Sequence, residues 1–204
     1  MTQNQQEQPT VFIVDDDPAI RFAMQALMDS VNIEHEIYSS GDEFLESVDD
    51  HRAGCLVLDI RMPGLGGLEL QEELIKREST LPIIFITGHG DVPMAVDAMQ
   101  KGAVDFIQKP FRDQDLLDRI REALKTDAER REEQQKHAEV AERLDRLTNR
   151  EREVFDLVVT GKPNKVIAYE LGVSQRTVEI HRARVMEKMQ ARSLADLVKM
   201  HMTA

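Results

Sequence analysis

Cysteine is scarce in this sequence, and no cluster of metal-binding residues of the zinc type is present. Cys55 is the single cysteine among 204 residues, so no disulfide can form within the chain. Its apolar neighbours indicate a small buried side chain rather than a reactive thiol. The 6 histidines and this cysteine do not gather at the spacings of a zinc site, which excludes that class of domain.

Long apolar runs are also lacking. No stretch approaches the roughly 20 apolar residues that a membrane-spanning helix needs. The start of the chain is polar and has neither the basic beginning nor the apolar centre of a signal peptide. We therefore expect residues 1–9 to form a disordered tail, and we expect a soluble, cytoplasmic protein with no membrane partner.

Basic residues are in the minority, and the imbalance is uneven. The formal net charge is −12. Residues 1–124 carry 10 Lys and Arg against 24 Asp and Glu, residues 125–146 carry 6 against 7, and residues 147–204 carry 10 against 7. An acidic front and a mildly basic back indicate two domains with different partners. The basic excess is small, so binding DNA would require well-placed side chains or dimerisation.

Apolar strand patterns alternate with helical patterns five times over residues 10–124. This alternation is typical of an α/β fold with a doubly wound five-stranded parallel sheet. Because the carboxyl ends of parallel strands share one edge of the sheet, the polar residues that follow the strands are expected to lie together. The predicted strands are Thr10–Val14, Ile33–Tyr38, a run that ends at Asp59, Pro82–Thr87 and Val104–Ile107.

Three carboxylates, those of Asp15, Asp16 and Asp59, would meet at this edge and repel one another. Mg²⁺ prefers carboxylate, water and phosphoryl oxygens, so it is the cofactor that such a cluster would hold. An ionised aspartate can also accept a phosphoryl group as a nucleophile. Lys109 would neutralise charge there, and the hydroxyl of Thr87 would hydrogen-bond a phosphoryl oxygen.

A plainer interpretation makes the run Asp15 to Asp17 a helix cap and Asp59 a loop residue. Asp17 followed by Pro18 has the form of a helix N-cap with Pro at the first helical position. Capping accounts for only one of these aspartates, so the grouped carboxylates favour a site.

Residues 10–124 resemble the receiver domain of bacterial two-component response regulators, which has a flavodoxin-like fold. The residues that carry the resemblance are Asp15-Asp16, Asp59 followed by Met62-Pro63-Gly64, Thr87, and Lys109-Pro110-Phe111. The resemblance implies that a sensor histidine kinase phosphorylates Asp59. It implies a Mg²⁺ site formed by Asp15, Asp16, Asp59 and the backbone carbonyl of Arg61.

The same resemblance implies that Thr87 and Lys109 contact the phosphoryl group. It also implies a cis peptide bond between Lys109 and Pro110, where a cis bond is inexpensive. Phe106 would be the switch aromatic, which turns inward as Thr87 moves toward the phosphate. The residues alone leave open that Phe106 is an ordinary residue of the sheet.

Residues 125–146 are highly charged, contain no Pro or Gly, and consist mainly of good helix formers. We predict a helical linker that continues the last helix of the first domain, which begins near Asp113. The apolar seam is too thin for a regular coiled coil, so a solvated or partly melted helix is favoured over pairing of two chains.

Residues 147–204 carry the signals of four short helices and are predicted to form an all-α helix-turn-helix domain. Thr148 followed by Glu151 is a capping box. Gly172 closes the second helix, and Ser174 begins a third helix that reaches about Met189. Ser193 begins the fourth helix, whose expected inward residues are Leu194, Leu197 and Val198.

The third of these helices has two distinct faces. Val178, Val185 and Met189 share an apolar stripe and are expected in the core. The face expected to enter the major groove of DNA consists of Arg176, Glu179, Ile180 and Ala183. The residues expected to contact phosphates are Lys165, Thr177, Arg182 and Arg184. His181 fits a packing or phosphate role better than metal binding.

Residues 147–202 resemble the LuxR/GerE-type DNA-binding domain. The matching segments are Leu147-Thr148-Asn149-Arg150-Glu151, Asn164 to Ala168, Leu171 to Ser174, and Thr177 to Arg182. Together the two resemblances are similar to the FixJ/NarL group of response regulators. They imply double-stranded DNA and a sensor kinase as partners, RNA polymerase as a candidate partner, and a homodimer that forms on phosphorylation.

The sequence therefore predicts a phosphorylation-switched transcription factor that is not an enzyme beyond slow self-dephosphorylation of Asp59. A phosphatase would need an acid or base two residues after Asp59, where Arg61 stands. The remaining alternative is a kinase-independent DNA-binding protein whose receiver is a dimerisation scaffold. The intact acidic cluster argues against that alternative.

Overall fold

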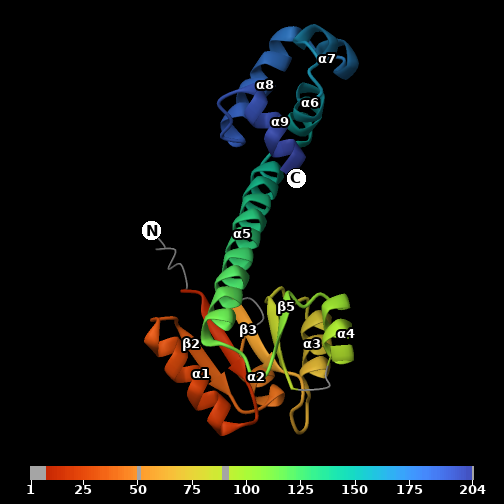
Figure 1. The fold of residues 1–204 in the computed structure, drawn as a ribbon. Helices are drawn as coiled ribbons and strands as arrows, with labels where there is room; N and C mark the ends of the chain where they lie inside the picture. The colour runs from red at the N-terminus through yellow and green to blue at the C-terminus, as the bar shows by residue number, and fades with distance from the viewer. Residues whose placement is uncertain (1–7, 50–51, 89–91, 204) are drawn as a thin grey trace. The chain divides into compact units, whose positions relative to one another are not determined.

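The computed structural model describes residues 8–49, 52–88 and 92–203 (Figure 1). The chain forms two compact units, Met1–Arg130 and Arg131–Ala204. The division falls inside the segment predicted to be a linker. The predicted tail and the glycine-rich turn after Thr87 lie largely outside the described residues.

The first unit is built on a five-stranded sheet with the order β2-β1-β3-β4-β5. Every neighbouring pair is parallel, as predicted. The strands are β1 Thr10–Val14, β2 His35–Tyr38, β3 Gly54–Asp59, β4 Ile83–Thr87 and β5 Asp105–Gln108. The helices are α1 Pro18–Ser30, α2 Gly41–Ser47, α3 Gly67–Lys76, α4 Val92–Gln100 and the first part of α5 Asp113–Asp145.

Helices cover both faces of this sheet because alternate strand residues point to opposite sides. Val11 and Ile13 pack with α1 and α5, whereas Phe12 and Val14 pack with α2, α3 and α4. The strands β1, β3 and β4 are buried along their whole length. Because the helices cover the two faces, the carboxyl edge of the sheet is where the polar residues at the strand ends lie together.

Three strands differ from the prediction at one or both ends. The second strand begins at His35 rather than Ile33, because the N–H of Ile33 donates to the carbonyl of Met28 and closes α1. The fourth strand begins at Ile83 rather than Pro82. The fifth strand runs over Asp105–Gln108, one residue later than predicted at both ends. The other strands end where they were expected to end.

The second unit contains four further helices and the last part of α5. These helices are α6 Asn149–Val159, α7 Asn164–Leu171, α8 Gln175–Lys188 and α9 Leu194–Thr203. The predicted capping box is confirmed: the hydroxyl of Thr148 accepts from the N–H of Glu151, and the Glu151 carboxylate accepts from the N–H of Thr148. Gly172 has a φ of 66°, a left-handed conformation that ends α7 before the turn.

The predicted core of this unit is largely confirmed, with one correction. Val178, Val185, Met189 and Leu197 are buried. Leu194, expected to point inward, is 38% exposed. It is the first residue of α9, and Leu197 occupies the inward position one turn later.

The predicted long helix is observed as α5, with 33 residues. Its middle, residues 132–139, is exposed. Its other parts are not a simple solvated helix, because Asp127 is buried and because Val140 and Leu144 join the core of the second unit. Over the described residues, no helix is both long enough and apolar enough to cross a membrane.

Candidate functional site

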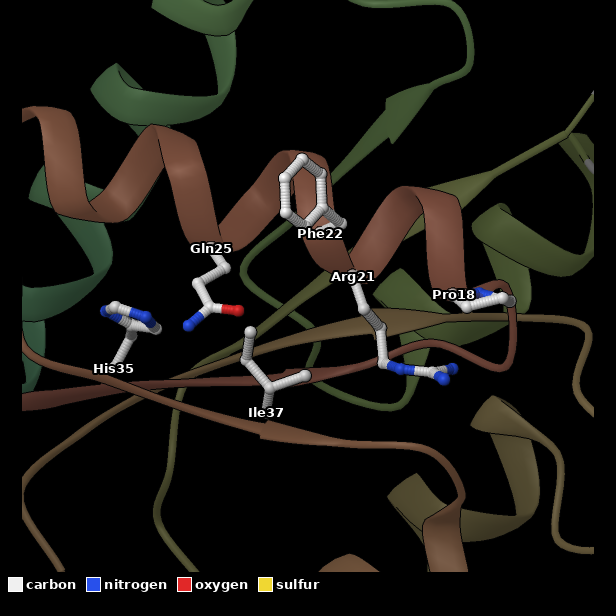
Figure 2. Close-up of a pocket in the computed structure, with 6 residues that line it drawn as sticks. All are labelled: Pro18, Arg21, Phe22, Gln25, His35 and Ile37. Carbon is white, nitrogen blue, oxygen red and sulfur yellow. The ribbon is translucent and has the colours of Figure 1, made fainter.

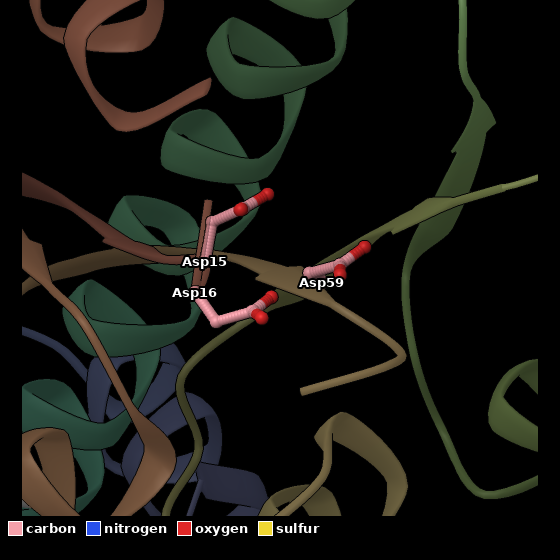
Figure 3. A group of neighbouring side chains, drawn as sticks. All are labelled: Asp15, Asp16 and Asp59. Carbon is pink, nitrogen blue, oxygen red and sulfur yellow. The ribbon is translucent and has the colours of Figure 1, made fainter. Parts of the chain in front are cut away.

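The predicted carboxylates meet at the carboxyl edge of the sheet (Figure 3). Asp15 follows β1 directly and Asp59 ends β3, and these strands are hydrogen-bonded neighbours in register at Val14 and Leu58. One carboxylate oxygen from each of Asp15, Asp16 and Asp59 lies within 4.8 Å of the others. Asp15 and Asp59 are buried and Asp16 is exposed, so the cluster opens to solvent on one side.

Lys109 brings a positive charge to this cluster. Its Nζ lies 2.9 Å from Asp15 Oδ2 and 3.2 Å from Asp59 Oδ1. The residue follows β5, and its own N–H donates to the carbonyl of Thr87. The bond between Lys109 and Pro110 is cis, as the resemblance implied. The structure thus joins residues that are 94 positions apart in the sequence.

The electrostatics of the cluster follow from its burial. Burial raises the pKa of the Asp59 carboxyl, the Lys109 ammonium opposes that rise, and Asp15 adds to it, with the net effect upward. Burial alone would lower the pKa of Lys109, but the carboxylates of Asp15 and Asp59 outweigh burial and raise it. One ammonium among three carboxylates leaves an excess of negative charge, and the oxygen donors fit Mg²⁺.

Thr87 and Phe106 lie on the strands next to this cluster. Thr87 is buried at the end of β4, and β4 is paired with β3 so that Ile86 faces Asp59. Phe106 lies on β5 opposite Phe85 and packs, partly buried, against the core on the side of α3 and α4. The roles of Thr87 as a phosphate contact and of Phe106 as a switch stay predictions. Arg61 follows β3 in the adjacent loop.

The capping interpretation accounts for Asp17 only. Asp17 Oδ1 accepts from the N–H of Ala19 and caps α1. Asp15 Oδ1 accepts from the N–H of Asp17 at 2.8 Å, while its other oxygen contacts Lys109. Asp59 is a buried strand end and not a loop residue.

Two residues that support the cluster were not predicted from the sequence. Arg21 Nη1 donates to the backbone carbonyl of Asp15 at 2.7 Å, which fixes the turn between β1 and α1. At Gly67 a Cβ would lie 2.3 Å from the carbonyl oxygen of Asp59, so the chain after the loop returns against β3 only with glycine there. The pair Gly66-Gly67 was a sequence signal that could have indicated a close approach of the backbone. Arg21 has no feature in the sequence that distinguishes it from other surface arginines.

A separate shallow pocket of about 360 Å³ lies between α1 and β2 (Figure 2). Phe22 is one of the residues that line it and is 74% exposed. Its lining residues are Pro18, Arg21, Phe22, Gln25, His35 and Ile37. The pocket contains no carboxylate, so it is not a candidate for the phosphoryl chemistry expected at the acidic cluster.

The predicted DNA-reading face of α8 is exposed, as a contact surface requires. Arg176, Glu179, Ile180 and Ala183 all point to solvent, and the apolar Ile180 is 46% exposed. The opposite stripe of the helix is buried in the core of the unit. One helix thus combines an inward apolar stripe with an outward mixed face.

The four residues expected to contact phosphates have different environments. Lys165 and Arg184 are exposed. The hydroxyls of Thr177 and Ser174 are 2.8 Å apart, and Arg182 Nη1 donates to Asn164 Oδ1 at 3.1 Å. Thr177 and Arg182 therefore also hold the start of α8 and join α8 to α7.

His181 is partly buried on α8. Among the described residues its Nδ1 is enclosed without a hydrogen-bond partner. Over all residues that the structure describes, the one group of three or more possible metal ligands is the aspartate cluster, and His181 is not part of it. The environment of His181 is that of a packing residue.

Comparison with known families matches both units. The response regulator receiver domain matches residues 11–121, and the domain of bacterial regulatory proteins of the luxR family matches residues 145–201. The first match contains the aspartate cluster, Thr87 and Lys109. The second contains the whole helix-turn-helix.

Relatives of similar length match nearly the whole chain. Nodulation protein W of Bradyrhizobium diazoefficiens is 49% identical over 193 residues, which cover 95% of this chain and 85% of that protein. Transcriptional regulatory protein FixJ of Azorhizobium caulinodans is 44% identical over 194 residues, covering 95% and 92%.

Solved structures agree with these matches. The response regulator StyR aligns with a TM-score of 0.90 and 44% identity over 97% of this chain and 100% of that one. Full-length FixJ from B. japonicum aligns with a TM-score of 0.61 and 40% identity, covering 96% and 97%. The chain belongs to the FixJ/NarL-type two-component response regulators, with a receiver domain followed by a LuxR-type DNA-binding domain.

Proposed function

We propose that this protein is switched by phosphorylation of Asp59 and that the phosphorylated form binds DNA as a dimer to regulate transcription. A sensor histidine kinase is the phosphoryl donor, and RNA polymerase is the further partner of the regulated step. The observation that carries the proposal is the contact of Lys109 with both Asp15 and Asp59 beside a buried threonine.

Asp59 is the proposed acceptor because of its place among the other polar strand ends. It lies at the centre of the cluster, between the strand ends that bear Asp15 and Thr87. A carboxylate oxygen attacks the phosphorus of the donor, and the bond from phosphorus to the donor's leaving group breaks. Lys109 and the hydroxyl of Thr87 then hold two of the new phosphoryl oxygens.

Mg²⁺ is the cofactor of this step. Asp15, Asp16 and Asp59 would hold it together with the backbone carbonyl of Arg61. When bound, the cation supplies the positive charge that three neighbouring carboxylates and an incoming phosphoryl group require.

Dimerisation is proposed to use the face formed by α4, β5 and α5. Exposed apolar side chains lie on α4 and directly before β5, namely those of Val96, Met99 and Val104. Phe106 lies on the same strand and is the switch that responds to Thr87. Pairing of two receivers there would bring two α8 helices to adjacent half-sites of DNA.

At the DNA, the exposed face of α8 reads base edges and its flanks hold phosphates. Glu179 would accept a hydrogen bond from a cytosine amino group, and Ile180 would contact a thymine methyl group. Lys165 and Arg184 would position the helix without reading sequence.

The test is an intact-mass measurement after incubation with Mg²⁺ and a small acyl phosphate, followed by sizing. Wild type should gain one phosphoryl group and shift toward dimer. Asp59→Ala should show neither change, whereas Asp42→Ala, which removes an exposed carboxylate at the start of α2, should behave as wild type. A wild-type protein without an adduct would favour the scaffold alternative.

A further inference from the structure

The helix α5 carries a buried carboxylate beyond the part that covers the sheet. Leu116, Leu117 and Ile120 pack into the core of the receiver. Asp127 follows on the same helix and is only 1% exposed, although the residues around it are charged and mostly solvent-facing. A buried carboxylate in such a segment requires a specific partner.

That partner is the backbone at the beginning of β3. The N–H of Gly54 donates to Asp127 Oδ2 at 3.0 Å, and both groups are buried. Two residues later on the same edge of β3, the N–H of Leu56 donates to the carbonyl of Pro82, just before β4 begins. The N–H of Gly54 lies beyond the amino end of β4. Asp127 therefore supplies the acceptor that a β4 with an earlier start would have supplied.

The position of this N–H is fixed by the fold. Gly54 has a φ of 151°, and a Cβ at this position would lie 1.9 Å from the carbonyl oxygen of Thr10. Only glycine fits there, and the close approach of β1 to β3 fixes the direction in which the N–H of Gly54 points. An acceptor on α5 must therefore lie in that direction.

Arg130 completes the arrangement. Its Nη2 lies 2.6 Å from Asp127 Oδ1, one turn further along α5. The guanidinium is about one-third exposed and compensates the buried negative charge. We call the carboxylate of Asp127, the N–H of Gly54 and the guanidinium of Arg130 the α5 clamp.

The α5 clamp joins the strand of the phosphorylation site to the helix that leads out of the receiver. β3 carries Asp59 at its carboxyl end and the clamp at its amino end. α5 carries the clamp and, further along, the residues Val140 and Leu144 in the core of the DNA-binding domain. The chain passes from one domain to the other within this helix.

We propose that Asp127 is a positioning residue that holds α5 on the receiver and is needed for phosphorylation of Asp59 to raise DNA affinity. The inference rests on the proposed function, since it assigns a coupling role within that switch. Without the carboxylate, the last receiver-bound turns of α5 separate from β3, and a change at the phosphorylation site no longer reaches the rest of the helix.

The single cysteine gives a direct measure of the clamp. Cys55 follows Gly54, is fully buried, and packs in the same core as the α5 residues. The rate at which a thiol reagent labels Cys55 in the folded protein therefore reports how often α5 separates from the sheet and exposes this core. Asp127→Ala leaves the buried N–H of Gly54 without its acceptor and should speed labelling by about tenfold or more.

Asp127→Asn keeps an acceptor oxygen for Gly54 and should give an intermediate labelling rate. Glu132→Ala is the matched control, because Glu132 forms an exposed ion pair with Lys136 on the same helix. It should leave labelling unchanged. Unchanged labelling in Asp127→Ala would overturn the clamp.

Coupling is measured on the full chain with duplex DNA selected from a random pool by the phosphorylated wild-type protein. The measured quantity is the ratio of Kd without and with phosphodonor. This ratio should fall to less than half of the wild-type ratio in Asp127→Ala, while the adduct on Asp59 forms to the same extent.

A destabilised receiver must be distinguished from an uncoupled one. Met28→Ala removes a buried side chain of α1 from the same core without touching the clamp, so it should speed Cys55 labelling but keep the affinity ratio. A normal ratio in Asp127→Ala would overturn this inference alone. A wild-type protein that forms no adduct would instead overturn the proposed function.

Discussion

Lys188, the last residue of α8, donates a 2.6 Å hydrogen bond to Glu151 in the first turn of α6. The same ammonium also donates to the backbone carbonyl of Arg146. The reading helix is thereby tied to the helix that opens the domain, and the buried Glu151 carboxylate has two tasks: it accepts from Lys188 and it closes the capping box of α6.

A pH dependence of stability follows from this contact. The Lys188 ammonium, together with the N–H of Thr148, lowers the pKa of Glu151 to about 2 from an ordinary value of 4.5. A carboxyl group with a lowered pKa in the folded state stabilises fully above its ordinary pKa, and this stabilisation is lost as the pH falls from 4.5 toward 2.

The corresponding measurement is urea unfolding of the full chain, monitored by circular dichroism, at several pH values between 7 and 3. Glu151→Gln should lower stability at pH 7 by about 1–3 kcal/mol, and its deficit should shrink as the pH falls. Glu153→Gln, which alters an exposed pair with Arg150, should cost far less. Equal deficits at pH 7 and pH 3 would contradict the assignment.

Removal of the Lys109 charge should slow phosphoryl uptake. Lys109→Met deletes the ammonium that contacts Asp15 and Asp59, so the incoming charge on the phosphoryl group is less well compensated. Uptake from a small acyl phosphate should be about 10- to 100-fold slower by intact mass. Lys76→Met alters an exposed lysine on α3 and serves as control; equal rates for the two variants would exclude Lys109 from the step.

Mg²⁺ should stabilise the receiver through the aspartate cluster. A cation present at 100 times its Kd and bound only by the folded state raises the free energy of unfolding by about 2.7 kcal/mol. Thermal unfolding with Mg²⁺ should therefore occur at a higher temperature than at the same ionic strength with Na⁺. Asp16→Ala should lose most of this shift and Asp42→Ala should keep it, because Asp42 lies outside the cluster.

The proposed dimer face predicts a variant that is phosphorylated but stays monomeric. Val96→Lys places a charge among the exposed apolar side chains of α4. It should gain the phosphoryl group as wild type does and yet show no shift toward dimer on sizing. Phe22→Lys places the same charge on the exposed part of α1, which packs on the opposite face of the sheet, and should still dimerise.

Contacts of α8 with DNA divide into two classes with different signatures. Glu179→Ala should relax the base preference at one position of selected sites, with a discrimination loss of about 1–3 kcal/mol. Lys165→Ala should weaken binding to all sequences and reduce the slope of log Kd against log salt by about 1. A uniform loss in Glu179→Ala, without a change in base preference, would place that residue outside the reading face.

Much of the fold could be predicted because the sequence signals that define it are local. Apolar runs that end in Asp15, Asp59 and Thr87 define strands and also place the site, since parallel strands bring their carboxyl ends to one edge. The start of β2 was misplaced because the N–H of Ile33 closes the preceding helix, a contact that periodicity does not show. Leu194 was misplaced because an apolar residue at the first position of a helix has no turn before it to define its face.

The α5 clamp was beyond reach of the sequence for a different reason. Asp127 and Gly54 are 73 residues apart, and each has an ordinary local explanation, one as a surface acid on a charged helix and the other as a loop glycine. Arg21 is similar, because its partner is a backbone carbonyl that no side-chain pattern marks. Long-range contacts between a side chain and the backbone leave no periodic trace.

The buried carboxylate on α5 also determines where this receiver can be joined to a different output domain. A chimeric protein that leaves the native sequence after Leu124 discards the acceptor for the N–H of Gly54, although every strand and the whole aspartate cluster are retained. A junction after Arg130 keeps both side chains of the α5 clamp. Among receiver chimeras that accept the phosphoryl group equally well, only those with the later junction should have an output domain that responds to phosphorylation.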